Sequence, residues 1–333
     1  EPMKHILLIA TGGTIASRET GQGLAPAITS REILGYVPAI GELCRVETIQ
    51  LMNLDSSNLG PSHWLRMARA IEEHYDQYDG FVVTHGTDTM AYTAAALSYL
   101  IQFSPKPIVL TGSQKSICLE NTDARMNLYN AFLYAAAEDS RGVSLVFDGK
   151  VILGTRARKE RTKSFNAFSS VDYPEIGVIR DGRLIRYLPA LDAKESPDFY
   201  HTLEDRVLLL TLIPGMGTEA LAALEDSYQA VILQSFGVGG LPGGGSGPFA
   251  QAVERWLQAG KTIVMLTQVP YEGSDMAVYQ VGYQVKEKYR LLEGYNMTLE
   301  AAVTKLMWVL GRTRDPEQVE ELFYRPVQWG IIR

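Results

Sequence analysis

Cysteine is scarce in this chain, and its placement excludes the usual zinc sites. The 333 residues include two cysteines, Cys44 and Cys118, which do not form a CxxC pair. The five histidines lack the HxH and HExxH spacings that hold zinc. We therefore expect no metal, and so little cysteine fits a reducing compartment.

Long apolar runs and an excess of positive charge are also missing. No apolar run reaches the roughly 18 residues that a membrane-spanning helix needs. The N-terminus does not combine a charged segment, an apolar core and a cleavage site, so we expect no signal peptide and a cytoplasmic location. The net charge of −7 argues against nucleic acid or an anionic membrane as the main partner.

Two familiar phosphate and hydrolase motifs are absent as well. The chain has no GxxxxGK[ST] and no GxSxG, which excludes a P-loop and a serine-hydrolase elbow. Residues 245–250 formally match GxGxxA, but Pro248 removes an N–H that a phosphate would need. The next apolar run ends Leu266-Thr267-Gln268 without an acidic residue, so we expect no dinucleotide site.

Strand-like and helix-like segments alternate along most of the chain. The apolar runs that predict buried strands are 5–10, 46–51, 80–84, 107–111, 143–147, 207–212, 230–235 and 262–267. Helical patterns lie at 61–75, 89–102, 122–137, 248–259 and 298–310. This alternation is typical of an α/β fold in which helices cover parallel sheets.

The length of the chain predicts more than one domain, because a single core rarely grows this large. A segment with two prolines and little apolar periodicity predicts a linker at 189–205. We expect a larger N-terminal α/β domain at 1–188, with a mostly parallel sheet flanked by helices. A smaller C-terminal α/β domain with a parallel sheet would follow at 206–333. Residues 150–155 and 175–179 predict short strands around a basic loop, as a hairpin at the domain edge.

The most informative segment is Thr11-Gly-Gly-Thr-Ile-Ala-Ser17, which directly follows the apolar run at 6–10. A strand that ends in two glycines makes a tight turn in which bare backbone approaches a ligand. Ligands of open α/β sheets bind at the edge where the parallel strands end. Taken alone, the segment fits a phosphate cradle, a nucleophile holder or a plain turn.

Two further hydroxyl-rich segments follow predicted strands. Thr84-His-Gly-Thr-Asp-Thr89 opens the helix at 89–102, and the free N–H groups of a helix start suit a developing oxyanion. Asn53-Leu-Asp-Ser-Ser-Asn58 offers small hydroxyls that bind a carboxylate. Taken by itself, the first segment fits helix capping and a functional role equally, whereas helix capping and turn formation explain the second segment better.

The fourth candidate functional segment is basic: Arg156-Ala-Arg-Lys-Glu-Arg-Thr-Lys-Ser164. Read alone, it predicts a solvated loop. A lysine that turned inward would lose solvation, and this lowers the pKa of an amine from its reference value of about 10.4 toward that of a useful base. Three early strands that each end in hydroxyls, at Thr14, Ser56–Ser57 and Thr87–Asp88, favour a threonine nucleophile with a base nearby.

These motifs resemble those of the bacterial-type L-asparaginases, and the likeness runs over nearly the whole chain. The matching segments are Thr11–Ser17, His85–Met90, Leu110–Gln114, Asp123–Asn127, Thr162–Ser164, Gln234–Gly239 and Met297–Ala301. The form Asp55-Ser56-Ser57 looks like the cytosolic type I branch, since the secreted type II branch more usually has glutamine in place of Ser57.

The resemblance implies that L-asparagine and water react to give L-aspartate and ammonia, and it leaves open a minor L-glutaminase activity. Thr14 would be the nucleophile. Thr87, Asp88 and Lys163 would form a second catalytic cluster, in which Lys163 accepts a proton through Thr87.

The resemblance also implies how the substrate is held. Ser56 would bind the α-carboxylate and Asp88 the α-ammonium, while Ser57 would line the same pocket. Backbone N–H groups near Gly13 and Thr87 would form the oxyanion hole. The family uses no metal or organic cofactor, and its members are homodimers or homotetramers.

The chain departs from the family pattern in the loop after the first motif. Most members carry a tyrosine there that is hydrogen-bonded to the nucleophile, whereas residues 18–26 contain none and Leu24 stands near its place. A leucine cannot relay a proton, so the sequence does not identify the residue that activates Thr14. Gly21 and Gly23 still allow this loop to act as a closing lid.

Two other functions fit the same motifs. A tRNA-dependent amidotransferase subunit that releases ammonia shares both threonine motifs, although it typically carries an extra N-terminal domain. An amino-acid-binding sensor would use the pocket without turnover, and the missing tyrosine motivates this alternative.

Overall fold

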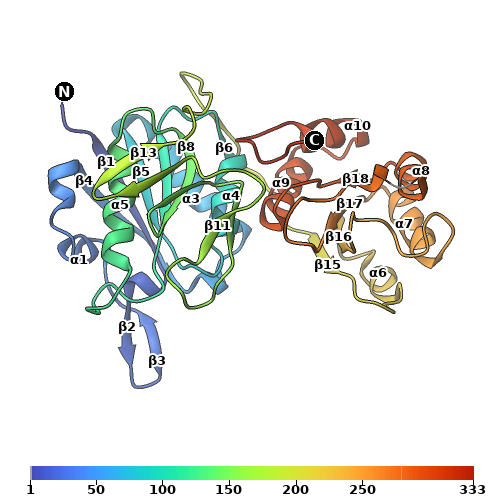
Figure 1. The fold of residues 1–333 in the computed structure, drawn as a ribbon, viewed down its shortest axis with the longest axis horizontal. Helices are drawn as coiled ribbons and strands as arrows, with labels where there is room; N and C mark the ends of the chain where they lie inside the picture. The colour runs from blue at the N-terminus through green and yellow to red at the C-terminus, as the bar shows by residue number, and fades with distance from the viewer. Residues whose placement is uncertain (1, 279) are drawn as a thin grey trace. The chain divides into compact units, whose positions relative to one another are not determined.

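The computed structural model describes residues 2–278 and 280–333. The chain divides into two compact α/β units, one ending at His201 and the other beginning at Thr202 (Figure 1). The predicted fold class is confirmed, since each unit has its own sheet and helices. The predicted limits of the domains stay a prediction. Inside the segment predicted as a linker, β14 (Asp198–Phe199) pairs with β6 (Ile101–Gln102) of the first unit.

The main sheet of the first unit has eight strands in the order β13-β12-β9-β8-β7-β5-β1-β4. Neighbours from β4 to β8 run parallel, and β9, β12 and β13 add an antiparallel edge, so the predicted edge hairpin around the basic loop is confirmed. The strands are β1 (His5–Gly12), β4 (Arg45–Leu54), β5 (Gly80–Thr84), β7 (Pro107–Thr111), β8 (Gly142–Phe147), β9 (Lys150–Leu153), β12 (Gly177–Arg180) and β13 (Arg183–Arg186). Smaller two-stranded sheets join β2 (Ser17–Thr20) to β3 (Gly23–Pro26), β10 (Ala157–Lys159) to β11 (Phe168–Ser170), and β14 to β6 (Ile101–Gln102).

The helices of this unit cover the sheet because its strands are apolar on both faces. Ile6 and Leu8 of β1 pack with Leu128 and Phe132 of α5 in one core cluster, and burial on both faces explains why β1 and β5 read as continuous apolar runs. The helices are α1 (Ser30–Gly35), α2 (Ile40–Leu43), α3 (Pro61–Glu73), α4 (Met90–Leu100) and α5 (Ala124–Ala136), with short 3₁₀ turns η1 (Thr14–Ala16), η2 (Ser56–Asn58) and η3 (Tyr75–Gln77).

The second unit is a four-stranded parallel sheet in the order β15-β16-β17-β18. Its core packs Val231 and Leu233 of β16 against Val253 and Trp256 of α7. The strands are β15 (Val207–Thr211), β16 (Ala230–Ser235), β17 (Thr262–Thr267) and β18 (Leu292–Glu293); the helices are α6 (Glu219–Leu224), α7 (Pro248–Gln258), α8 (Gln280–Tyr289), α9 (Leu299–Arg312) and α10 (Pro316–Tyr324), with the 3₁₀ turn η4 (Met276–Val278). Within residues 2–278 and 280–333, no helix has both the length and the apolar character of a membrane span.

Glycines let the turns at the carboxyl edge of the first sheet touch backbone to backbone. A Cβ on Gly13 would lie 2.4 Å from the nitrogen of Gly86, and a Cβ on Gly86 would lie 2.7 Å from Oγ of Ser56. A Cβ on Gly112 would lie 2.2 Å from the carbonyl oxygen of His85. These contacts draw the turns after β1, β4, β5 and β7 into one cluster, since none of the three glycines has a side chain that would hold the turns apart.

The turn after β5 is further held by a buried chain of hydrogen bonds. His85 is fully buried, and its Nδ1 donates to the carbonyl of Gly86 at 2.7 Å, which requires the proton to be on Nδ1. Its Nε2 then accepts from Thr93 Oγ1 at 2.7 Å, and Thr93 accepts from the indole N–H of Trp64 at 3.0 Å. A neutral imidazole satisfies every member of this chain.

The strands β2 and β3 form a hairpin that leaves the sheet just after η1 and extends away from it (Figure 1). The predicted mobile loop therefore has regular structure here, with Ser17 opposite Pro26 and Glu19 opposite Leu24. Its action as a lid stays a prediction.

We expect Gly13→Ala to destabilise the protein by about 2–3 kcal/mol more than Gly23→Ala, because overpacking adds to backbone strain. Both glycines have positive φ, +84° and +108°, but only Gly13 faces a backbone atom within 4 Å of the added Cβ. Urea unfolding of the two variants measures the difference. Equal destabilisation would mean that the contact with Gly86 is unimportant.

Burial lowers the pKa of His85 to about 4, from 6.5 for the free side chain. Because the unfolded chain binds the proton more readily, we expect stability to fall as the pH drops from 6.5 to 4, by on the order of 3 kcal/mol from this residue. Above pH 6.5 the contribution is complete. Comparing urea midpoints of the wild type and His85→Gln between pH 4 and 7 isolates it, and identical pH dependence in the two proteins would contradict the assignment.

Candidate active site

A cavity of about 250 Å³ opens at the carboxyl edge of the first sheet. The turns after β1, β4, β5 and β7 contribute to its wall, together with the β2–β3 hairpin and the segment after β10. The lining residues are Gly13, Thr14, Ser17, Leu24, Pro26, Asp55, Ser56, Gly86, Thr87, Asp88, Gln114, Lys159 and Thr162. The structure thus brings together Thr14, Ser56, Thr87 and Asp88, as the sequence predicted.

Thr14 opens the 3₁₀ turn η1 and is half-buried in the cavity wall. Its Oγ1 makes no hydrogen bond within the part of the chain that the structure describes, so the hydroxyl is available to a ligand. Gly13 lines the cavity too, but its N–H donates to the carbonyl of Leu54 at 3.0 Å. This N–H of Gly13 is therefore already paired, and the expectation that N–H groups near Gly13 serve an oxyanion hole stays a prediction; the N–H of Thr87 has no partner among the described residues.

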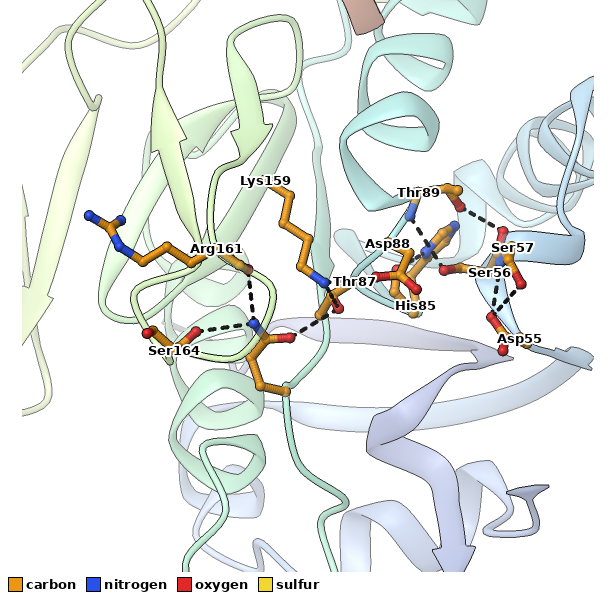
Figure 2. Close-up of polar contacts among 12 residues, drawn as sticks. Asp55, Ser56, Ser57, His85, Thr87, Asp88, Thr89, Lys159, Arg161 and Ser164 are labelled. Carbon is orange, nitrogen blue, oxygen red and sulfur yellow. Dashed lines mark hydrogen bonds and ion pairs between the residues drawn. The ribbon is translucent and has the colours of Figure 1, made fainter. Parts of the chain in front are cut away.

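A lysine, a threonine and a carboxylate form a directly hydrogen-bonded cluster in the cavity lining (Figure 2). Lys159 Nζ donates to Thr87 Oγ1 at 2.9 Å and to Asp88 Oδ1 at 2.8 Å. The Lys159 side chain is 16% exposed and that of Asp88 67% exposed, so the cation is held inside while the carboxylate faces the opening. One carboxylate oxygen of Asp88 stays available for a second cation.

The lysine predicted for this cluster was Lys163, and that prediction is wrong. Lys159 ends the short strand β10, which pairs with β11 and brings this side chain to Thr87. Lys163 lies four residues later in a loop, 161–166, whose residues are all exposed. Both lysines stand in one basic run, and the resemblance of Thr162–Ser164 to a family motif pointed to the wrong one. Recognising Ala157–Lys159 as a strand would have been the signal for Lys159.

Ser56 is positioned to donate a hydrogen bond to a ligand. Its side chain is buried, and its Oγ accepts from the N–H of Thr89 at 3.3 Å, which leaves the hydroxyl hydrogen to donate. Thr89 Oγ1 in turn donates to the carbonyl of Ser56 at 2.8 Å, so this hydroxyl ties the two turns together instead of capping α4.

Ser57 does not line the cavity, contrary to the prediction. It is exposed, and both its N–H and its hydroxyl donate to Asp55 Oδ1, at 3.0 and 2.9 Å. Asp55 takes its place in the wall. Asp55 caps η2 through its side chain. Sequence reasoning missed it as a cavity residue because an aspartate before two serines is typical of a simple turn.

Leu24 contributes an apolar side chain at the opening and is 58% exposed. It offers neither a proton donor nor an acceptor to Thr14. Sequence reasoning also missed Gln114 and Thr162, which line the cavity beside Thr87 and Lys159. In the described part of the chain, no group of three or more His, Cys, Asp or Glu side chains could hold a metal ion.

The arrangement combines two threonine hydroxyls, a half-buried cation and an unpaired backbone N–H around one small cavity. A hydroxyl nucleophile, a proton carrier and a donor to a developing oxyanion are the groups that acyl transfer from an amide requires. Polar groups for a carboxylate and an ammonium line the same cavity, at Ser56 and Asp88.

Comparison with known families covers almost all of the chain. Residues 5–190 match the family described as asparaginase, N-terminal, and residues 206–323 match the glutaminase/asparaginase C-terminal domain. An L-asparaginase of Thermococcus kodakarensis is 38% identical over 328 residues, which are 98% of this chain and 98% of that protein. A solved structure of a thermostable L-asparaginase from Thermococcus kodakarensis superimposes with a TM-score of 0.91 at 35% identity, covering 99% of each chain.

Two other relatives bear on the function. The structure of L-asparaginase I from Vibrio cholerae has a TM-score of 0.89 at 28% identity, over 100% of both chains. A glutamyl-tRNA(Gln) amidotransferase subunit of Pyrococcus abyssi is 33% identical, over 96% of this chain and 75% of that protein. With both family regions matched in order along the chain, and with the threonine-lined cavity in its first unit, the chain belongs to the asparaginase family.

Proposed function

We propose that this protein is an L-asparaginase that hydrolyses L-asparagine to L-aspartate and ammonia. The observation that carries the proposal is the meeting of Thr14 with Thr87, Lys159 and Asp88 around one cavity. The names of the relatives from Thermococcus and Vibrio agree with it.

Substrate binding follows from the charges on the wall. Ser56 donates its hydroxyl hydrogen to the α-carboxylate of asparagine. Asp88 binds the α-ammonium through the oxygen that Lys159 leaves unpaired. These two contacts fix both ends of the amino-acid moiety, so the side-chain amide extends toward the threonines.

Thr14 Oγ1 attacks the side-chain amide carbon, and the N–H of Thr87 stabilises the negative charge that develops on the amide oxygen. As the new C–O bond forms, the hydroxyl proton passes through Thr87 to Lys159 in its amine form. The lysine returns this proton to the amide nitrogen, the C–N bond breaks and ammonia leaves. An aspartyl ester of Thr14 remains.

Water completes the reaction. It attacks the ester carbon, the bond to Thr14 Oγ1 breaks, and the threonine recovers a proton while aspartate is released. Leu24 takes no part in proton transfer, so the Thr87–Lys159 pair is the proton carrier in both halves of the reaction.

A cytoplasmic location is consistent with the scarcity of cysteine, and fractionation of the source cells tests it.

Ammonia release from L-asparagine, with L-glutamine assayed in parallel at the same concentration, tests the proposal. We expect asparagine turnover in the wild type, and a fall in kcat of on the order of 10³ or more in Thr14→Ala and in Thr87→Val, as for a lost nucleophile or proton carrier. Release from neither amide by the folded wild type would support an amino-acid-binding sensor instead. Co-purification with tRNA or a second subunit would support the amidotransferase function.

The same assay separates the two lysines of the basic segment. We expect Lys159→Met to reduce kcat by on the order of 10²–10⁴, the range typical of a lost general base. Lys163→Met is the matched control and should retain near-normal turnover, since this side chain lies in the exposed loop. The opposite ranking would restore Lys163 to the catalytic cluster.

We also propose that the protein is a homodimer or homotetramer. Exposed apolar side chains follow the ends of β15, β16 and β17 at one edge of the second sheet: Ile213, Phe236, Val269 and Tyr271, which are 61%, 40%, 47% and 48% exposed. Clustered apolar side chains of this kind typically mark an interaction surface.

A mass of two or four times 36.8 kDa is expected from light scattering after size-exclusion chromatography. Phe236→Asp should shift the mass toward that of one chain, because burying an unpaired charge opposes association. A wild-type protein that stays at the mass of one chain at micromolar concentration would contradict the proposal.

A further inference from the structure

Gln114 lies on a turn that the surrounding backbone holds firmly. The turn follows β7, and the N–H groups of Gln114 and Lys115 both donate to the carboxylate of Asp123, at 2.9 and 3.0 Å. Asn127 Nδ2 donates to the carbonyl of Gly112 at 2.9 Å. The start of the Gln114 side chain is therefore fixed relative to the sheet, and its amide reaches the cavity wall.

Both ends of the Gln114 amide are used. Its Nε2 donates to the carbonyls of Arg161 and Ser164, at 3.2 and 3.1 Å, and its Oε1 accepts from Thr87 Oγ1 at 3.2 Å. The two carbonyls can only accept, so the amide cannot be turned the other way round. One side chain thus connects the threonine of the catalytic cluster to the loop that follows Lys159.

The bond to Gln114 also sets the direction of the Thr87 hydroxyl. Lys159 Nζ donates to Thr87 Oγ1, so the hydroxyl hydrogen is the group that Thr87 offers to Gln114 Oε1. With one acceptor and one donor direction occupied, the hydroxyl cannot rotate freely. The oxygen is then held within hydrogen-bond distance of Lys159, and transfer of a proton to the lysine requires the hydroxyl hydrogen to turn from Gln114 toward Nζ.

The loop contact has a separate consequence. Residues 161–166 are all exposed, and their other hydrogen bonds in the described part of the chain stay within the loop and its base, such as Arg161 Nη1 to Asn166 O at 3.0 Å. Thr162, which lines the cavity, lies between the two carbonyls that Gln114 binds. The amide therefore holds Thr162 in the wall.

We propose that Gln114 is a positioning residue, which orients the Thr87 hydroxyl and clamps the loop 161–164 beside the cavity. The first role rests on the proposed amide hydrolysis, and the second does not. The two roles can be measured separately, because the loop contains the trypsin sites Arg161 and Lys163.

The experiment compares wild type, Gln114→Met, Gln114→Glu and the matched control Lys115→Gln, after thermal unfolding has established that each is folded. Methionine keeps the length of the side chain but removes both sets of hydrogen bonds. We expect trypsin to cleave after Arg161 or Lys163 about tenfold faster in Gln114→Met, as for the loss of neutral hydrogen bonds that close the loop. We expect kcat for asparagine to fall about tenfold while KM changes less than about twofold.

Glutamate separates the two roles, because its carboxylate accepts from Thr87 but cannot donate to the carbonyls of the loop. We expect loop cleavage in Gln114→Glu to match Gln114→Met, with a smaller fall in kcat. Lys115→Gln should behave as the wild type in both assays.

The two proposals fail in different ways. A wild type that releases no ammonia, while Gln114→Met still exposes the loop, would overturn the proposed hydrolysis and leave the clamp in place. Normal cleavage and normal kcat in Gln114→Met would overturn the positioning role. A raised KM with unchanged kcat would also overturn it, since that result assigns Gln114 to direct substrate binding.

Discussion

The contact of Gly13 with Gly86 is the constraint on which the site depends. Parallel strands leave their carboxyl ends at one edge, but ordinary side chains would hold the turns apart. Here a Cβ on Gly13 would lie 2.4 Å from the nitrogen of Gly86, and a Cβ on Gly86 would lie 2.7 Å from the side chain of Ser56. Backbone therefore meets backbone, and Thr14 and Thr87, each one residue beyond a glycine, reach the same cavity of about 250 Å³.

Polar groups then fill a small space without leaving buried charge unpaired. Lys159 is compensated by Asp88 on the open side and by Thr87 within, so the cation needs no water on its inner face. Behind the wall, neutral His85 holds the Gly86 carbonyl through a chain that ends at Trp64. Neutral His85 thus lies deep in the unit, whereas the charged Lys159–Asp88 pair lies at the cavity. This distribution agrees with the higher free energy of burying an ion.

The strands of the sheets and the two threonines of the site could be predicted from the sequence because the patterns that mark them are local. Apolar runs marked β1, β5 and β16 closely, and glycines and hydroxyls after the strands marked the turns around Thr14 and Thr87. Lys159 was missed because two lysines share one basic run, and only the pairing of β10 with β11 separates them. Ser57 was wrongly predicted to line the cavity because its hydroxyl donates to Asp55 instead of facing a ligand. Residue types alone do not show which of these two partners a serine hydroxyl takes.

The hydrogen bonds that build this cluster join residues far apart in the chain. Thr87 and Lys159 are separated by 72 positions, Gln114 and Arg161 by 47, and Ser56 and Thr89 by 33. Contacts of long sequence separation form late in folding, because the intervening chain must first lose its conformational entropy. The site is thus absent from any early folding intermediate that contains only local structure. During refolding, the ability to bind an amino acid would appear with the completed first sheet, well after most helical signal has returned.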